Sequence, residues 1–274
     1  MVSGALPAVR RLPRALLVAG SLAAPLGGCL TGDRLAPSAH AERAWRAFME
    51  GRRQDGRREL EAAERAGPVP ETLAIRARFL VFRGELDRAE GLLRQVKARA
   101  PHLIAARNEL GVLLMLGGRT PEALQEFEAL ARISNAPPEI LNNLGVALLA
   151  RRRIAAAERV LRRAVAGNIR NATATSNHAL ALYELGRKSE AHRAWRAAVY
   201  MDPSNAGALA GLGICLLQKG RDREGIRALA QAAMLDASFR TGREAAARCA
   251  WPPTAAADLD AGLRRVPVIA RIRQ

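Results

Sequence analysis

Apolar residues recur along this chain at the spacing of one helix face, and the clearest run lies within residues 141–148. Its leucines and Gly145 occupy positions i, i+3, i+4 and i+7, which is typical of a helix that buries one stripe. A glycine inside a helix costs roughly 1 kcal/mol relative to alanine. Gly145 therefore indicates that a second helix approaches closely at this point. The same pattern surrounds Gly111, 34 residues earlier, and Gly213, 68 residues later.

This 34-residue period continues through five consecutive repeats. The repeats begin at Pro70, Ile104, Pro138, Ala172 and Ala206. Position 8 of each repeat is small: Ala77, Gly111, Gly145, Ala179 and Gly213. Position 24 is bulky: Leu93, Phe127, Leu161, Trp195 and Leu229. Position 15 is glycine in four repeats and Arg152 in the other, which predicts a turn between two helices. Small residues at positions 8 and 20 would let these helices cross closely, with the bulky side chains beside the crossing.

This register resembles the tetratricopeptide repeat (TPR) family. The resemblance implies an all-α fold: a right-handed superhelical TPR solenoid of about six helix-turn-helix repeats with a C-terminal capping helix. Residues 37–69 are interpreted as an atypical first repeat, so the array spans 37–239 with repeats starting near 37, 70, 104, 138, 172 and 206. Residues 240–274 are interpreted as the capping helix, ended by Trp251-Pro252-Pro253, and a tail, with one more short helix expected over 255–265.

Residues 1–28 are interpreted as the signal peptide of a lipoprotein. A basic start precedes an apolar run from Ala15 to Leu26, which is too short to span a bilayer comfortably. The run ends in Leu26-Gly27-Gly28-Cys29, which resembles a bacterial lipobox. That resemblance implies a diacylglyceryl group on Cys29, cleavage before it and a further acyl chain such as palmitate on the new amine. Ordinary cleavage that leaves a free thiol, and an uncleaved anchor, stay open.

Membrane attachment follows from the lipobox resemblance, with residues 29–36 as a tether. Several acyl chains anchor a protein stably, whereas one chain does so only marginally. Leu30, which follows the cysteine, favours the outer membrane by the sorting rule of enteric lipoproteins. The expected location is therefore the outer membrane, facing the periplasm.

The chain is strongly basic, with a formal net charge of +17, and nearly all of its basic residues are arginine. A solvated arginine-rich surface accounts for this most simply. Attraction to anionic lipid headgroups, lipopolysaccharide or an acidic partner comes next. Nucleic acid comes last, because the chain is expected to be exported and only 4% of its residues are aromatic.

Catalytic and metal-binding motifs are missing from the sequence. The four histidines form no metal-ligand pair and no nucleophile–base arrangement, and His178 falls at a core-facing repeat position. We therefore expect no enzyme activity, no cofactor, no metal and no small-molecule substrate. Cys215 and Cys249 occupy the same position of neighbouring repeats, which should lie further apart than the 7 Å a disulfide allows. Two buried thiols are favoured, although an oxidising periplasm leaves the disulfide open.

The candidate binding site is the groove that TPR proteins form from the first helix of each repeat. An amide side chain both donates and accepts hydrogen bonds, so a ladder of asparagines would match an extended peptide backbone, and the apolar row beside it would take the side chains of a peptide or helix. The expected groove residues are Asn108, Asn142, Asn143, Val146, Asn177, Leu180, Tyr183 and Ile214. The alternative is that the asparagines cap or pack locally and the apolar row contacts the next helix.

A lipid anchor, a short tether and six repeats together resemble the pilotin-type lipoproteins of type IV pili. That resemblance implies a protein-interaction scaffold in bacterial envelope assembly, acting on a pilus or secretin component. Two alternatives stay open. One is a TPR lipoprotein of a tight-adherence pilus or gliding-motility machine. The other is an adaptor for peptidoglycan-processing enzymes.

Overall fold

A computed structural model describes residues 37–67 and 69–266 of the chain. The predicted signal peptide (1–28), the lipidation site Cys29 and the tether (29–36) lie outside these residues. Within the described ranges every regular element is a helix. None of these helices is both long and apolar enough to cross a membrane.

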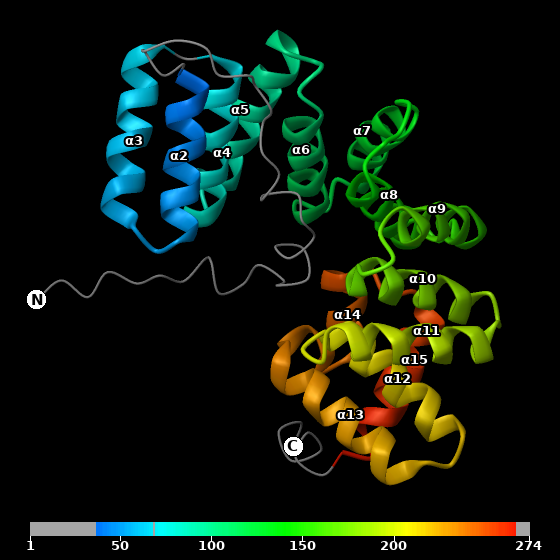
Figure 1. The fold of residues 1–274 in the computed structure, drawn as a ribbon. Coiled ribbons are helices and arrows are strands. Elements are labelled where there is room, and N and C mark those ends of the chain that lie inside the picture. Colours follow the sequence, from blue (N-terminus) through cyan, green and yellow to red (C-terminus); the bar gives the residue numbers. More distant parts are fainter. Residues whose placement is uncertain (1–36, 68, 267–274) are drawn as a thin grey trace, which may run out of the picture. The chain divides into compact units, whose positions relative to one another are not determined.

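The helices come in consecutive pairs, as the repeat pattern predicts (Figure 1). Each pair has a first helix and a second helix of similar length. Helices α4, α6, α8, α10 and α12 begin at the five residues that open the sequence repeats. The bounds are α2 Pro37–Met49, α3 Arg53–Ala66, α4 Pro70–Arg83, α5 Leu86–Arg99, α6 Ile104–Leu116, α7 Thr120–Ala131, α8 Pro138–Ala150, α9 Ile154–Gly167, α10 Ala172–Glu184, α11 Lys188–Met201, α12 Ala206–Gln218, α13 Asp222–Leu235, the 3-10 helix η2 Ala237–Phe239, α14 Gly242–Cys249 and α15 Pro253–Leu263.

The described chain divides into two compact parts between Gly117 and Gly118. The N-terminal body contains α2–α6, and the C-terminal body contains α7–α15. Each body is described by itself below.

Close helix crossings in the C-terminal body use the small repeat positions. A Cβ atom added to Gly145 would fall within 3.0 Å of Leu161, at position 24 of the same repeat. A Cβ atom added to Gly213 would likewise lie 2.8 Å from the nearest atoms of Leu229. Gly225, at position 20, would bring a Cβ atom to 2.7 Å from Leu217. The predicted pairing of small and bulky positions is confirmed at these crossings, because even a methyl group would force the facing leucine to shift.

The turn inside each pair uses a left-handed backbone. Position 15 has a positive φ in all five repeats: 81° at Gly84, 74° at Gly118, 57° at Arg152, 76° at Gly186 and 74° at Gly220. Glycine reaches this region without steric cost, whereas Arg152 reaches it at some strain. The turn predicted from the glycines is thus confirmed, including the one repeat that lacks the glycine.

An ion pair recurs where the second helix begins. The arginine at position 16 caps the helix and binds the glutamate three residues later, in the first turn. The pairs are Arg119–Glu122 at 2.5 Å, Arg187–Glu190 at 2.7 Å and Arg221–Glu224 at 2.6 Å. A carboxylate in the first turn is also favoured by the helix dipole. We call these arginines the paired arginines.

The N-terminal body holds a buried ion pair between consecutive first helices. Arg78 on α4 binds Glu109 on α6 through Nε at 2.7 Å and Nη2 at 2.6 Å, and both residues are less than 4% exposed. The guanidinium also lies 5.7 Å from the ring centroid of Trp45 on α2. Trp45 in turn packs with Phe48 and Phe79. This cluster therefore joins three helices around one buried charge pair.

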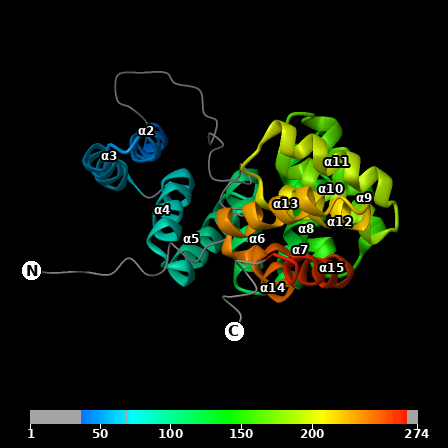
Figure 2. The same cartoon turned by 90° about the horizontal axis from the view of Figure 1, so that it is seen from below.

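The C-terminal end of the chain folds back onto the array. The sequence predicts a capping helix and one short helix, and the structure has both as α14 and α15. Helix α15 packs against α10, α12 and α13, and the 3-10 helix η2 packs against α13 (Figure 2). Phe239 and Trp251 pack edge to face at this end, with ring centroids 5.4 Å apart. The chain thus covers part of its own array.

Candidate protein-binding face

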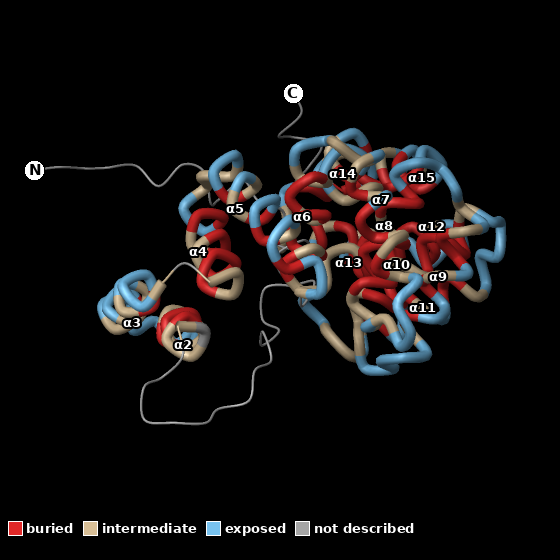
Figure 3. The backbone as a smooth tube through the Cα atoms, turned by 90° about the horizontal axis from the view of Figure 1, so that it is seen from above, coloured by how far each residue is buried: buried red, intermediate tan, exposed pale blue. Residues whose placement is uncertain are grey.

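The candidate site is the first-helix face of the C-terminal body, formed by α8, α10 and α12. Figure 3 shows buried residues concentrated along these three helices and exposed residues on the outer turns. Five of the predicted groove residues on these helices are buried, each with at most 4% of its surface exposed: Asn142, Asn143, Leu180, Tyr183 and Ile214. Val146 and Asn177 are half-buried. Asn108 lies on α6 of the N-terminal body and is also buried.

Three of the predicted groove asparagines hydrogen-bond one another inside the chain. The Asn177 side-chain amide donates to Asn142 Oδ1 at 2.9 Å, and Asn142 donates to Asn143 Oδ1 at 3.4 Å. The first bond ties α10 to α8, and the second lies within α8. The expectation of an open row of amides is corrected here, because neighbouring first helices pack closely enough for the amides to satisfy one another. Peptide binding at this face stays a prediction, and Val146 and Asn177 are the predicted residues of α8 and α10 that keep some exposure.

Helix α15 covers the far end of the face, and polar contacts fix it there. Tyr183 Oη donates to Asp258 Oδ2 at 2.5 Å, and the Gln218 amide donates to Tyr183 Oη at 2.6 Å and to Asp258 at 3.2 Å. Burial, aided by the Asp258 carboxylate, raises the pKa of Tyr183, so its hydroxyl remains a donor. The Ala255 backbone amide, in the first turn of α15, donates to Glu184 at 2.7 Å. Tyr183 therefore binds the chain's own C-terminal helix, which the sequence prediction of a free groove residue did not foresee.

Asp258→Ala is expected to loosen α15 without unfolding the array. The change leaves the buried Tyr183 hydroxyl without its acceptor, which costs about 1–3 kcal/mol. Amide hydrogen exchange in α15 should then speed up by a factor of ten or more, while exchange in α8 and α9 stays unchanged. Asp258→Asn keeps an acceptor oxygen, so its α15 exchange rate should lie between those of the native chain and Asp258→Ala. Equal α15 exchange in all three proteins would show that these bonds do not hold the helix.

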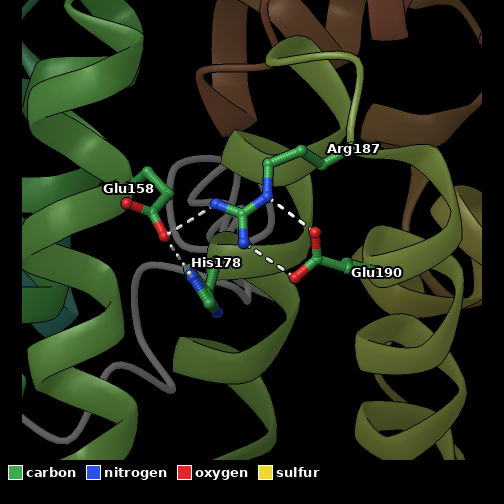
Figure 4. Close-up of polar contacts among 4 residues, drawn as sticks. All are labelled: Glu158, His178, Arg187 and Glu190. Atoms are coloured by element: carbon green, nitrogen blue, oxygen red, sulfur yellow. Dashed lines mark hydrogen bonds and ion pairs between the residues drawn. The ribbon is translucent and has the colours of Figure 1, made fainter.

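A polar cluster of Glu158, His178, Arg187 and Glu190 links neighbouring helices of the C-terminal body (Figure 4). Glu158 Oε1 accepts from His178 Nε2 and from Arg187 Nη1, each at 3.3 Å, and Arg187 binds Glu190 with its other nitrogens. Burial lowers the pKa of His178, with a smaller opposing effect from Glu158. Each group is held by another member of the cluster, so the cluster joins α9, α10 and α11. The prediction of a packed His178 missed this ion network.

Cys215 and Cys249 are separate thiols, as favoured from the sequence, but Cys249 is only half-buried where two buried thiols were expected. Cys215 is buried on α12, and burial raises its pKa to about 11. Burial likewise raises the pKa of Cys249 to about 12. Neither thiol is activated for chemistry. Among the residues that the structure describes, no group of His, Cys, Asp and Glu could hold a metal ion.

Family models for the tetratricopeptide repeat match most of the helical array. One model matches residues 76–138 and 176–241, and a second one matches residues 139–170. Together they cover more than half of the chain. No curated protein matches the sequence significantly.

Solved TPR structures are similar in fold. PilF of Pseudomonas aeruginosa is 20% identical, with a TM-score of 0.63 over 73% of this chain and 91% of its own. PilW, a widely conserved type IV pilus biogenesis factor, is 17% identical, with a TM-score of 0.62 over 74% of this chain and 94% of its own. YrrB, a TPR protein with an unusual peptide-binding site, is 22% identical, with a TM-score of 0.50 over 64% and 90%. At these identities the similarity concerns the fold, a helical TPR solenoid.

Proposed function

Because this chain belongs to the tetratricopeptide repeat family, whose fold is a scaffold for protein–protein interaction, we propose that it binds client proteins at the bacterial envelope. In this proposal Cys29 carries the lipid anchor, the outer membrane is the site of action and the clients are components of a pilus or secretin, as for a pilotin-type factor. No cofactor and no catalytic step are part of the proposal.

The observation that carries the proposal is the similarity to PilW, which extends over 94% of that pilus biogenesis factor. The Leu26-Gly27-Gly28-Cys29 sequence supports the anchor independently, since it provides the thiol and the small neighbours that lipoprotein processing uses. An anchored array raises the local concentration of its clients at the membrane, which favours assembly there.

The client is expected to contact the part of the first-helix face that α15 leaves uncovered. Half-buried Val146 and Asn177 lie there on α8 and α10. A small apolar side chain beside an amide suits a segment with one apolar anchor and a free backbone polar group. The client is thus expected to be an apolar peptide or helix rather than an acidic tail.

Crosslinking and pulldown of the anchored protein from envelope fractions tests the proposal. The double variant Val146→Ala and Asn177→Ala should recover about five- to tenfold less of a pilus or secretin component, as expected when anchor residues are truncated. Ile169→Ala, which changes a residue 74% exposed outside the face, should recover as much as the native chain. Cys29→Ser should lack the acyl chains and keep residues 1–28 uncleaved.

Two outcomes would contradict the proposal. Recovery of peptidoglycan-processing enzymes in place of pilus components would favour the adaptor role. Equal recovery of the same clients by the double variant would move the binding site away from α8 and α10.

A further inference from the structure

The second helices of the C-terminal body carry a regular row of arginines that form no ion pair. Position 22 is arginine in three consecutive repeats: Arg159 on α9, Arg193 on α11 and Arg227 on α13. All three residues are exposed. Equivalent positions of neighbouring repeats differ only by the small rotation between repeats, so the three arginines are expected to form a ladder across three helices.

Each arginine continues into a stripe along its helix. Positions 22, 25 and 29 share one face of a helix, because they are spaced i, i+3 and i+7. Position 25 adds Arg162 and Arg196, and position 29 adds Tyr200 and Met234, which are 90% and 84% exposed. We call these seven residues the arginine face.

Charge balance separates the arginine face from the paired arginines. Arg119, Arg187 and Arg221 each hold a glutamate within 2.7 Å. Within residues 37–67 and 69–266, none of the five arginines of the arginine face forms a salt bridge or hydrogen bond. Between positions 20 and 30 of these three repeats the single acid is Glu158, which is buried and bound to His178 and Arg187. Glu190, one turn before Arg193, attracts that arginine but is itself bound to Arg187. The face therefore carries an excess of positive charge.

We propose that the arginine face binds an anionic phospholipid membrane surface. Guanidinium groups pair bidentately with phosphate, and a ladder over three helices matches a plane of phosphates better than it matches a single acidic chain. Tyr200 and Met234 complete the match, since an aromatic and a flexible apolar side chain beside arginines can enter the boundary between headgroups and acyl chains. This binding is separate from the acyl anchor and from the client face of α8 and α10.

Fluorescence at Met234 tests the membrane contact. The full chain carries Met234→Cys labelled with the environment-sensitive dye NBD, with Cys29→Ser, Cys215→Ala and Cys249→Ala so that no acyl chain and no other thiol contributes. Vesicles of phosphatidylcholine with about one third phosphatidylglycerol should shift the emission to shorter wavelength, and vesicles of phosphatidylcholine alone should not. Each arginine near an anionic surface contributes about fivefold to binding. Arg159→Gln with Arg193→Gln and Arg227→Gln should therefore raise the lipid concentration for half-maximal shift on the order of a hundredfold.

A matched variant controls for net charge. Arg119→Gln with Arg187→Gln and Arg221→Gln removes the same three charges but from the paired arginines, and it should bind lipid nearly as the native chain does. Equal weakening in both triple variants, or no shift with the anionic vesicles, would overturn the proposal. Capture of an acidic protein that needs the arginine face, without a shift on vesicles, would overturn it in favour of a protein partner. None of these results depends on the anchor or on the identity of the client.

Discussion

Arg78→Met is expected to lower the free energy of unfolding of the N-terminal body by about 3–5 kcal/mol at pH 8, the usual cost of removing one partner from a buried ion pair. Glu109 is only 3% exposed, so its carboxylate would be left without a countercharge and without water. Trp45 would also lose the cation over its ring. Denaturant-dependent hydrogen exchange of the α4 and α6 amides measures the loss.

The loss of unfolding free energy in Arg78→Met should depend on pH, and the protonation of Glu109 sets the direction of that dependence. Burial raises the pKa of Glu109 from 4.5 to about 7, although Arg78 opposes the shift. A carboxyl with a higher pKa in the folded state binds more protons when folded. Its contribution to stability is therefore fully present below about pH 4.5 and is lost as the pH rises to about 7.

Removal of Arg78 should raise the pKa of Glu109 further, so at pH 5 the neutral acid makes the Arg78→Met variant less unstable than it is at pH 8. The double variant Arg78→Met and Glu109→Gln has no buried charge and should lose this pH dependence. A penalty that is the same at both values of pH would contradict this account of the ion pair.

Gly211→Ala should destabilise the C-terminal body by about 1–3 kcal/mol or more, as overpacking of a core does. The new methyl group would fall within 3.0 Å of the Trp195 indole, which is fully buried and rigid. The gain in helix propensity, at most about 1 kcal/mol, offsets only part of this cost. Thermal unfolding followed by tryptophan fluorescence should show a lower midpoint, by about 2–4 °C for each kcal/mol.

Gly207→Ala is the matched control on the same helix. Its methyl group would meet its nearest neighbour at 3.5 Å, which is an ordinary contact. Helix propensity alone should then stabilise this variant by up to about 1 kcal/mol. If Gly211→Ala were as stable as Gly207→Ala, the indole would not pack against α12 as described.

Helix pairing could be predicted from the sequence because its causes recur with the repeat. A glycine at position 15 enters the left-handed turn, and a glycine at position 8 accepts a large side chain from position 24. These requirements are local, so one repeat indicates what the next will do. The turn at Arg152 follows the others because the flanking helices impose it.

Burial of the candidate face could not be predicted in the same way. Repeat position fixes the direction of a side chain relative to its own helix, but it does not say which element covers that side chain. Tyr183 contacts Asp258, 75 residues later in the chain, from a helix that stands outside the period. The buried pair of Arg78 and Glu109 also departs from the repeat pattern. Where the repeat that begins at Pro70 carries Arg78, the four later repeats carry Val112, Val146, Leu180 and Ile214. The sequence feature that could have predicted this pair is the presence of opposite charges, Arg78 and Glu109, in two consecutive first helices.

The return of α15 also alters how the array should come apart. A stack of repeats in which each contacts only its neighbours frays from its ends, one repeat at a time. Helix α15 instead reaches the repeat of α12 and, beyond it, the repeat of α10. Opening the last repeat therefore requires release of a helix that is also fixed to the preceding repeat, so the segment from α10 to α15 should open as one cooperative block with a single exchange free energy. A chaperone or protease that waits for a frayed C-terminal repeat would find none until the whole block opens.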